Sequence, residues 1–164
     1  MEGILVINKP QEWTSHDCVA VCRRATGEKR VGHGGTLDPM AEGVLPVFIG
    51  RATRIMEYMD LGCKTYRCCM RLGIVTDTED IWGEILEERS IEGITEDQIR
   101  QTAESFCGDI LQKPPMYSAL KIKGRKLYEY ARQGITLDIQ PRPVRIENLE
   151  IEEIDLKRKE VVFE

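Results

Sequence analysis

Residues 32–45 read Gly32-His33-Gly34-Gly35-Thr36-Leu37-Asp38-Pro39-Met40-Ala41-Glu42-Gly43-Val44-Leu45, and the rest of the chain is organised around this glycine-rich stretch. Glycines at this density permit positive φ angles and the close approach of another backbone or a ligand. Pro39 disfavours the α region for the residue before it, so we expect Asp38 to lie in an extended turn that projects its carboxylate. Apolar flanks anchor the loop, which is a common way to present a catalytic group. The alternative is a tight turn in which Asp38 only caps the segment that follows.

Composition and length place the chain among soluble globular proteins of one domain. It has 164 residues, of which 41% are hydrophobic and 31% charged, both ordinary values for that class. It contains no basic leader followed by an apolar run, and no apolar stretch of membrane-spanning length. Its six cysteines form no Cys-x-x-Cys pair and it has only two histidines, which disfavours a zinc site. Reduced thiols and the absence of a leader predict a cytoplasmic protein.

The charge distribution indicates an anionic partner although the formal net charge is -5. One basic cluster precedes the central stretch and consists of Arg23, Arg24, Lys29 and Arg30. A second cluster lies further along the chain and consists of Lys121, Lys123, Arg125, Lys126 and Arg132. Local positive patches on an acidic protein attract anions such as phosphates. The alternative for either cluster is a solvated helix face.

The pattern of apolar and turn residues predicts a mixed arrangement of helices and strands. We expect strands at 3–8, 44–49, 64–73, around 144–151 and at 160–164, the first of them buried. We expect helices over 16–25, in a short segment through Ile55, Met56 and Met59, after a capping box at 95–98, and over 125–133. Gly27, Gly108 and Gly134 are expected to end three of these helices. Because strands and helices do not alternate regularly, we predict an α+β fold with a largely antiparallel or mixed central sheet flanked by helices.

Two further segments have simple interpretations. The acidic residues of 76–80 lack the spacing of a calcium-binding loop, so we expect a solvated polar loop there. In the predicted helix after 95–98, Ile99, Ala103 and Phe106 are expected to point inward.

Four blocks of the sequence together resemble the TruB family of tRNA pseudouridine synthases, which act on uridine 55 of the T-loop. The blocks span residues 3 to about 134, and only their combined order and spacing is specific. They are Asn8-Lys9-Pro10 with Thr14-Ser15, the stretch 32–45, Arg71-Leu72-Gly73 with 76–80, and 116–121 with 127–134.

The resemblance implies a pseudouridine synthase fold, a single catalytic domain over residues 1–164, a tRNA partner, a monomer, and neither a cofactor nor a metal. It identifies Asp38 with the catalytic aspartate and Tyr66 with the tyrosine that stacks on the target uracil. His33 matches the histidine that meets the RNA near the flipped base, although from the residues alone a cap on the glycine turn explains it as well. Lys9 and Pro10 match a pair that lines the floor of the site. Phosphate contacts are expected from Lys121, Arg125, Lys126 and Arg132.

Two departures from the family pattern matter. Glu12 stands where the family usually has glycine. A later block, whose arginine pairs with the catalytic aspartate, and a small PUA-like RNA-binding domain are expected beyond Glu164. The resemblance therefore implies that the chain corresponds to a truncated enzyme, with a fold incomplete at its C-terminus.

The implied chemistry needs a carboxylate but no redox change, because the N-glycosidic bond is cut and the uracil is rejoined through C5. Asp38 has three routes: attack on the anomeric carbon, addition to the uracil ring, or abstraction of a sugar proton. Two other classes of function compete with this one. The chain is alternatively a weakly active or inactive RNA-binding fragment, or a phosphate-binding enzyme that uses residues 32–35 as a cradle. The last is disfavoured because the glycines match neither Walker A nor the dinucleotide fingerprint.

Overall fold

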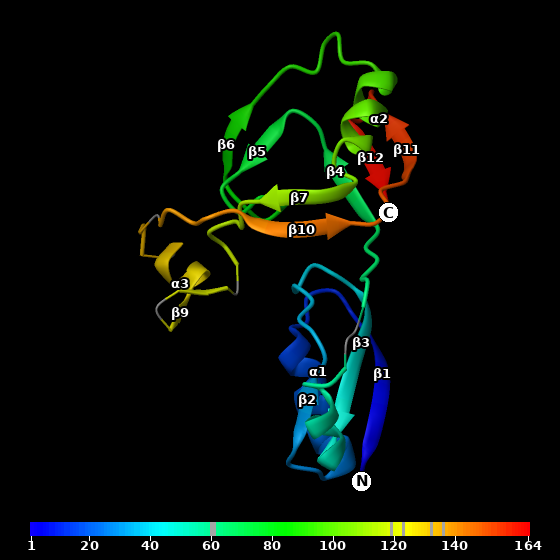
Figure 1. Ribbon diagram of the computed structural model, residues 1–164, viewed down its shortest axis with the longest axis vertical. Helices are drawn as coiled ribbons and strands as arrows, with labels where there is room; N and C mark the ends of the chain where they lie inside the picture. Colours follow the sequence, from blue (N-terminus) through cyan, green and yellow to red (C-terminus); the bar gives the residue numbers. More distant parts are fainter. Residues whose placement is uncertain (60–61, 119, 123, 132, 136) are drawn as a thin grey trace. The chain divides into compact units, whose positions relative to one another are not determined.

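The structure, a computed structural model, describes residues 1–59, 62–118, 120–122, 124–131, 133–135 and 137–164. The chain divides into two compact units, Met1–Lys64 and Thr65–Glu164, which we describe separately (Figure 1).

The first unit is a small antiparallel sheet covered on one face by a helix. Its strands are β1 (Gly3–Lys9), β3 (Gly43–Ile49) and β2 (Val31–His33), and they lie in the order β1-β3-β2. In the register, Gly3 pairs with Ile49 and Lys9 with Gly43, so the end of β1 and the start of β3 lie together. A short 3-10 helix, η1 (Gly50–Ile55), follows β3 directly.

Helix α1 (Ser15–Thr26) begins and ends where local sequence signals predict. Thr14 is the N-cap, and it exchanges hydrogen bonds with Asp17 in a capping box that satisfies two free N–H groups of the first turn. Gly27 has φ 66 and ends the helix in the left-handed region. The buried face of α1 packs on the sheet and forms the core with Cys18, Val19, Cys22, Val31, Leu45, Val47 and Ile49.

The composition of the first strand predicted that it is buried, but in the structure one of its faces is exposed. Ile4 is 45% and Val6 71% exposed, whereas Ile7 packs against the core. Successive side chains of a strand point to opposite faces, and only one face of this sheet is covered by α1. No strand was predicted at Val31–His33, which pairs with β3.

The second unit contains short antiparallel strand pairs and two helices. One three-stranded sheet has the order β11-β12-β4, and three two-stranded sheets are β10-β7, β5-β6 and β8-β9. The bounds of the strands are β4 Cys68–Arg71, β5 Ile74–Thr76, β6 Ile85–Glu88, β7 Gly108–Gln112, β8 Lys121–Ile122, β9 Arg125–Lys126, β10 Arg142–Ile146, β11 Ile151–Asp155 and β12 Glu160–Phe163. The helices are α2 Glu96–Glu104 and α3 Leu127–Ala131.

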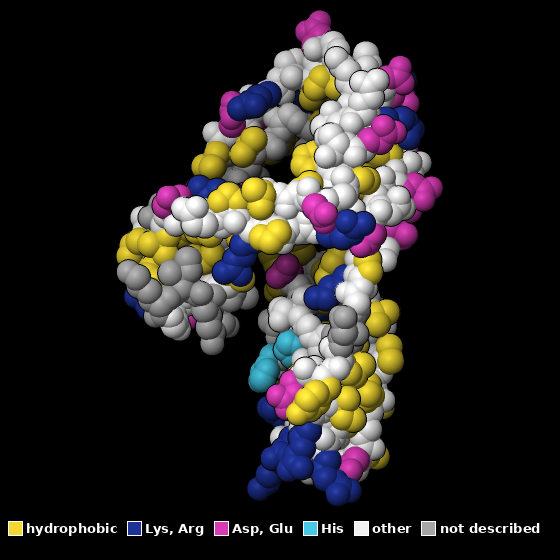
Figure 2. Space-filling view, in the orientation of Figure 1, with side chains coloured by type: hydrophobic (Ala, Val, Ile, Leu, Met, Phe, Trp, Pro, Cys, Tyr) yellow, Lys and Arg dark blue, Asp and Glu magenta, His cyan; other side chains and the backbone are white. Residues whose placement is uncertain are grey.

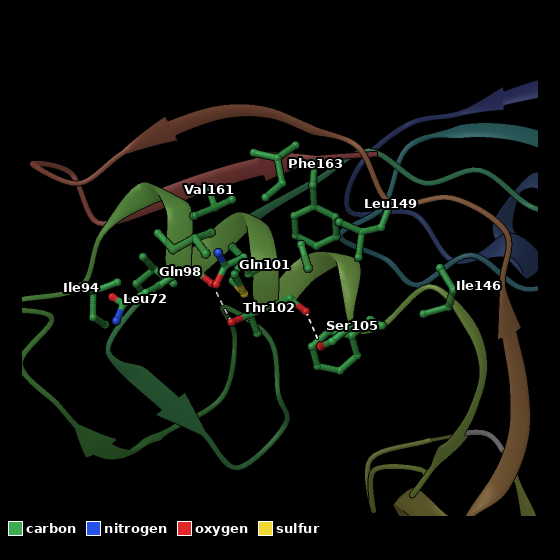
Figure 3. A pocket seen from close by; sticks show the side chains of 15 residues that line it. Leu72, Ile94, Gln98, Gln101, Thr102, Ser105, Ile146, Leu149, Val161 and Phe163 are labelled. Atoms are coloured by element: carbon green, nitrogen blue, oxygen red, sulfur yellow. Dashed lines mark hydrogen bonds between the residues drawn. The ribbon is translucent and has the colours of Figure 1, made fainter.

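A largely apolar hollow of about 900 Å³ lies between α2 and the β11-β12-β4 sheet (Figure 3). Ile99 and Ala103 of α2 line it, and so does Phe106, which follows the helix, so the three positions predicted to point inward face this hollow. No residue of α2 is fully buried, however, and Phe106 is 48% exposed. The predicted capping box at Thr95 and Gln98 is confirmed.

Three predicted elements of the second unit differ in extent. The strand expected at 64–73 is limited to β4, and the helix expected over 125–133 is limited to α3. Gly124 adopts φ 82 and allows the chain to turn back, so Arg125 and Lys126 pair with β8 instead of starting a helix. Gly108 does not end α2, which stops at Glu104, but begins β7 with φ 94.

The strand pairs are antiparallel in both units, which confirms the predicted α+β class. In the part of the chain that the structure describes, no helix has the length and apolar character needed to cross a bilayer.

Candidate active site

Asp38 lies in the loop that joins β2 to β3, two neighbouring strands of the first sheet. The loop is closed at its base by a hydrogen bond of 2.9 Å from Gly34 N to the carbonyl oxygen of Pro46. Asp38 and Pro39 begin a turn in which Ala41 N donates to the Asp38 carbonyl oxygen at 3.0 Å. The Asp38 carboxylate is exposed, and no described residue forms a hydrogen bond or an ion pair with it. The tight turn is therefore present, but its closure uses the Asp38 backbone and leaves the carboxylate available.

Ser15 holds the residue before Asp38. Its hydroxyl accepts a hydrogen bond from Leu37 N at 2.9 Å and donates one to the Leu37 carbonyl oxygen at 3.1 Å. Ser15 is 3% exposed, so both bonds are shielded from water. Because Ser15 is the first residue of α1, this pair of bonds fixes the main chain of the loop to the start of the helix.

Lys9 holds the residue after Asp38. Its side chain is completely buried, and its ammonium nitrogen donates to the carbonyl oxygens of Trp13 at 2.6 Å, Pro10 at 2.9 Å and Pro39 at 3.3 Å. These three acceptors use all three donors of the ammonium group. Lys9 thus connects the end of β1, the segment before α1 and the Asp38 turn. The resemblance implies that Lys9 lines the floor of the site; in the structure its ammonium group contacts main-chain carbonyl groups.

Glu12 provides a second contact to Pro39. Its backbone N–H donates to the Pro39 carbonyl oxygen at 2.8 Å, and its φ angle is 67. This left-handed conformation is the one that glycine adopts without a steric penalty. The departure from the family glycine at this position therefore falls on a strained residue that contacts the candidate site.

His33 is attached to the same loop. It is the last residue of β2 and partly buried, and its Nδ1 contacts the carbonyl oxygen of Gly35. This contact fits the simpler interpretation of His33 as a cap on the glycine turn. It also holds the imidazole ring at the base of the loop that carries Asp38.

The titratable groups at the start of α1 have different environments. Hydrogen bonds from the Thr14 side chain and backbone hold the pKa of Asp17 below its ordinary value. Burial raises the pKa of the Cys18 thiol, which keeps it protonated within the core. Among the described residues, no group of three or more His, Cys, Asp or Glu side chains is placed to hold a metal ion.

The predicted site residues of the second unit lie in different local environments. Tyr66 precedes β4 and is 50% exposed, so an aromatic face is available on this unit. Arg125 lies 4.9 Å from the centre of the Tyr130 ring and 3.9 Å from the Glu129 carboxylate. Lys121 and Lys126 are opposite each other in the β8-β9 register. Arg132 lies outside the described residues, and so does Lys123 of the same cluster.

The contacts that Ser15 and Glu12 make with the Asp38 turn were not predicted from the sequence. The capping box with Asp17 makes Thr14 the N-cap of α1, which leaves the Ser15 hydroxyl for another partner. A family glycine replaced by glutamate was the available signal for a positive φ at Glu12.

Comparisons with known proteins agree on one family. The model of the TruB family pseudouridylate synthase (N terminal domain) matches residues 23–164. The tRNA pseudouridine synthase B of Alkaliphilus oremlandii is 51% identical over 164 residues, which are 100% of this chain and 54% of that protein. The protein of the same name from Synechocystis sp. is 48% identical over 151 residues, 92% of this chain and 51% of that protein. The chain thus spans about half the length of the curated relatives it matches.

Solved structures support the same fold. A chain in the crystal structure of a Cbf5-Nop10-Gar1 complex is 30% identical, with a TM-score of 0.69 over 98% of this chain and 38% of that chain. A chain in the structure of an H/ACA RNP bound to a substrate RNA containing 2'-deoxyuridine is 25% identical, with a TM-score of 0.65 over 98% of this chain and 36% of that one. From the match over residues 23–164, together with the identity to these relatives, the chain belongs to the TruB family of pseudouridine synthases.

Proposed function

We propose that this chain carries the catalytic carboxylate of an enzyme that converts uridine to pseudouridine in RNA, with uridine 55 in the T-loop of tRNA as its substrate. Family membership supports the reaction class, and relatives about half identical to the chain are named tRNA pseudouridine synthase B. The alternative of an RNA-binding fragment without turnover is separated from this proposal by the experiment below.

The observation that carries the proposal is the contrast between the backbone and the side chain at Asp38. Ser15 holds Leu37, while Lys9 and Glu12 hold Pro39, so the main chain is fixed on both sides. The carboxylate itself is exposed and has no partner among the described residues. A group that is rigidly placed and chemically unengaged is suited to act on a bound substrate, because catalysis depends on pre-set geometry.

The charged form of Asp38 is the form that all three routes require. Water solvates the exposed carboxylate and stabilises its negative charge before the substrate binds. A base that enters the site displaces this water and strengthens the interaction of the carboxylate with the developing positive charge of the sugar. Asp38 then acts as nucleophile toward C1' or C6, or as base toward a sugar proton.

The other predicted residues serve binding in this proposal. Tyr66 stacks on the extruded uracil, a contact worth about 1–3 kcal/mol, which offsets the few kcal/mol needed to flip a base. His33 meets the RNA next to that base. The exposed Pro10, whose carbonyl oxygen accepts a hydrogen bond from Lys9, contacts the base itself. Phosphates are met by Lys121, Arg125, Lys126 and Arg132.

The test replaces Asp38 by Asn, which keeps the shape and removes the charge. We expect pseudouridine formation on unmodified tRNA to fall by at least about a hundredfold, the lower range for a lost acid–base group, while tRNA affinity changes little. Glu42→Gln is the matched control, because Glu42 is an exposed carboxylate of the same loop without a partner among the described residues.

Three outcomes are informative. Near-native turnover by Asp38→Asn rejects Asp38 as the catalytic group. Binding of tRNA by the native chain without any pseudouridine formation supports the RNA-binding alternative. Equal turnover on tRNA in which uridine 55 is replaced by cytidine rejects the proposed target position.

A further inference from the structure

Five exposed basic residues gather at one end of the first unit, and we call this group the basic end. Lys and Arg side chains are prominent there in the space-filling view, near the N-terminus (Figure 2). The group consists of Arg23, Arg24, Lys29, Arg30 and Arg51.

The fold brings these residues together from three segments. Arg23 and Arg24 occupy the last turn of α1, and Gly27 returns the chain so that Lys29 follows closely. Arg23, Arg24 and Lys29 line one hollow of about 610 Å³. A hydrogen bond of 2.7 Å from Gly50 N to the Arg30 carbonyl oxygen then brings the start of η1, and with it Arg51, to the same end.

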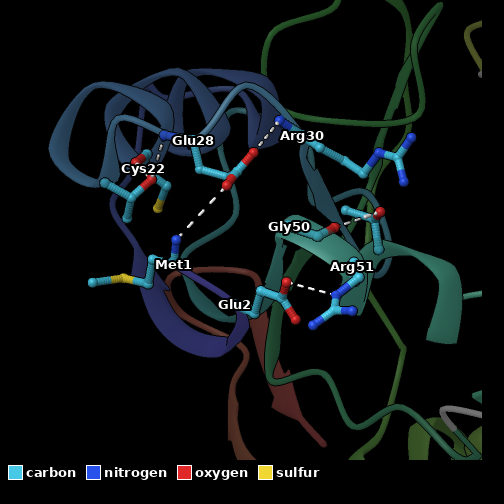
Figure 4. A network of polar contacts seen from close by, with 9 residues as sticks. Met1, Glu2, Cys22, Glu28, Arg30, Gly50 and Arg51 are labelled. Atoms are coloured by element: carbon cyan, nitrogen blue, oxygen red, sulfur yellow. Dashed lines mark hydrogen bonds and ion pairs between the residues drawn. The ribbon is translucent and has the colours of Figure 1, made fainter.

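The carboxylates at this end are already engaged (Figure 4). Glu2 accepts a hydrogen bond of 2.7 Å from Arg51 Nε, which raises the pKa of that guanidinium. Glu28 lies 3.7 Å from the Met1 ammonium and accepts a hydrogen bond from Arg30 N at 3.3 Å. The Arg30 side chain extends away from Glu28.

Three cationic side chains of the basic end have no carboxylate partner among the described residues. Arg23 donates to the Val31 carbonyl oxygen at 3.1 Å and so has a structural partner. The side chains of Arg24, Lys29 and Arg30 are exposed and form no ion pair with any carboxylate of the described residues. A concentration of unpaired positive charge on a chain of net charge -5 creates a local field that attracts a polyanion.

The distance between the basic end and the Asp38 loop follows from α1. Ser15 at the start of the helix contacts Leu37, while Arg23 and Arg24 lie in its last turn. Arg24 lies nine residues after Ser15, which at about 1.5 Å per residue is about 13 Å along the helix axis, so at least about this distance separates the two features. A single nucleotide bound at Asp38 does not reach so far, whereas a folded RNA does.

We propose that the basic end binds the phosphate backbone of the substrate RNA, at a position at least about 13 Å along α1 from the Asp38 loop. This inference rests on the proposed function, since it takes the substrate to be an RNA. Arg24, Lys29 and Arg30 make the phosphate contacts, which position the RNA without reading its sequence. They contribute to affinity and leave the chemical step unchanged.

The experiment uses the triple variant Arg24→Ala, Lys29→Ala, Arg30→Ala of the protein. The control variant Arg100→Ala, Arg142→Ala, Lys157→Ala removes the same charge from three exposed side chains of the second unit. Each protein is titrated over a salt series with two RNA hairpins that share one uridine-containing loop. Their stems have about twelve and about four base pairs, so that only the longer one extends well beyond about 13 Å.

For the long hairpin we expect the triple variant to bind about tenfold more weakly than the native protein. The slope of log K against log salt concentration falls by about 2 to 3, as for three lost phosphate contacts. For the short hairpin the two proteins bind equally, and single-turnover pseudouridine formation at saturating RNA is the same for both.

The outcomes that overturn the inference differ from those that overturn the proposed function. Equal affinity and equal salt slope of native and triple variant for the long hairpin reject the phosphate contacts. An equal loss in the control variant, or an equal loss for both hairpins, attributes the effect to net charge and also rejects them. If the native protein neither binds nor modifies either RNA, the proposed function itself fails.

Discussion

The burial of Lys9 allows a sharp test of how the candidate site is held together. Lys9 is completely buried, and its ammonium nitrogen contacts three carbonyl oxygens from the segments that surround the Asp38 turn. Lys9→Met keeps a long unbranched side chain and removes all three donors. The variant therefore probes the hydrogen bonds more than the packing.

The expected loss follows from which carbonyls become unpaired. Pro39 keeps the hydrogen bond from Glu12 N, so only the carbonyl oxygens of Pro10 and Trp13 lose their donor. Two unpaired acceptors cost about 2–6 kcal/mol if they stay shielded from water. Methionine no longer has to bury an ammonium group, which recovers part of this cost. We expect the free energy of unfolding of the first unit to fall by about 2–3 kcal/mol.

Tryptophan fluorescence reports on each unit separately during urea denaturation. Trp13 belongs to the first unit and Trp82 to the second, so a Trp82→Phe background follows the first unit alone. In the same variant we expect single-turnover pseudouridine formation to fall by about 10- to 100-fold, because the Asp38 turn is displaced. Lys157→Met, at an exposed position, is the control.

Two results refute this reasoning in different ways. A stability within about 0.5 kcal/mol of the native protein, the usual range for surface substitutions, shows that the three bonds are not net stabilising. A stability loss together with a native single-turnover rate shows that Lys9 holds the fold without positioning Asp38.

Three further predictions concern the residues around this turn. Ser15→Ala removes both bonds to Leu37, and we expect it to lower the free energy of unfolding by about 2 kcal/mol in urea denaturation, whereas Ser15→Thr, which keeps the hydroxyl, loses less. Glu12→Gly relieves a left-handed conformation, so we expect the urea midpoint to rise by the equivalent of about 0.5–1 kcal/mol; a lower midpoint contradicts this. The pKa of Asp17 is depressed in the folded state, so the stability that its carboxylate contributes is present above the ordinary pKa near 3.8 and is lost as the pH falls through the folded pKa. In acid denaturation we therefore expect the native protein and Asp17→Asn to converge in stability; a constant difference at low pH contradicts this.

Local signals allowed the sequence to predict much of the first unit. The bounds of α1 differ from the predicted ones by one residue at each end, because a capping box and Gly27 define them within a few neighbouring residues. The Asp-Pro turn was predictable for the same reason, since Pro39 restricts the residue before it. The start of α2 follows the same rule through Thr95 and Gln98.

Features that depend on distant contacts were not predictable in this way. A lysine is expected at the surface, and only the convergence of three carbonyl groups explains the complete burial of Lys9. Similarly, the exposure of Ile4 and Val6 depends on which face of the sheet the helix covers. Arg125 and Lys126 had the pattern of a helix start, but pairing with β8 took them into a hairpin.

The contacts at the candidate site also explain why Asp38 is the residue whose substitution tests chemistry most directly. Every described contact that holds this turn ends on main-chain atoms of Leu37, Asp38 or Pro39. A change of the Asp38 side chain therefore leaves the contacts from Lys9 and Ser15 in place. The turn keeps its position, since Pro39 still restricts the residue before it whether that residue is Asp or Asn. A loss of turnover in Asp38→Asn with native stability consequently measures the carboxylate, whereas a loss in Lys9→Met or Ser15→Ala measures its placement.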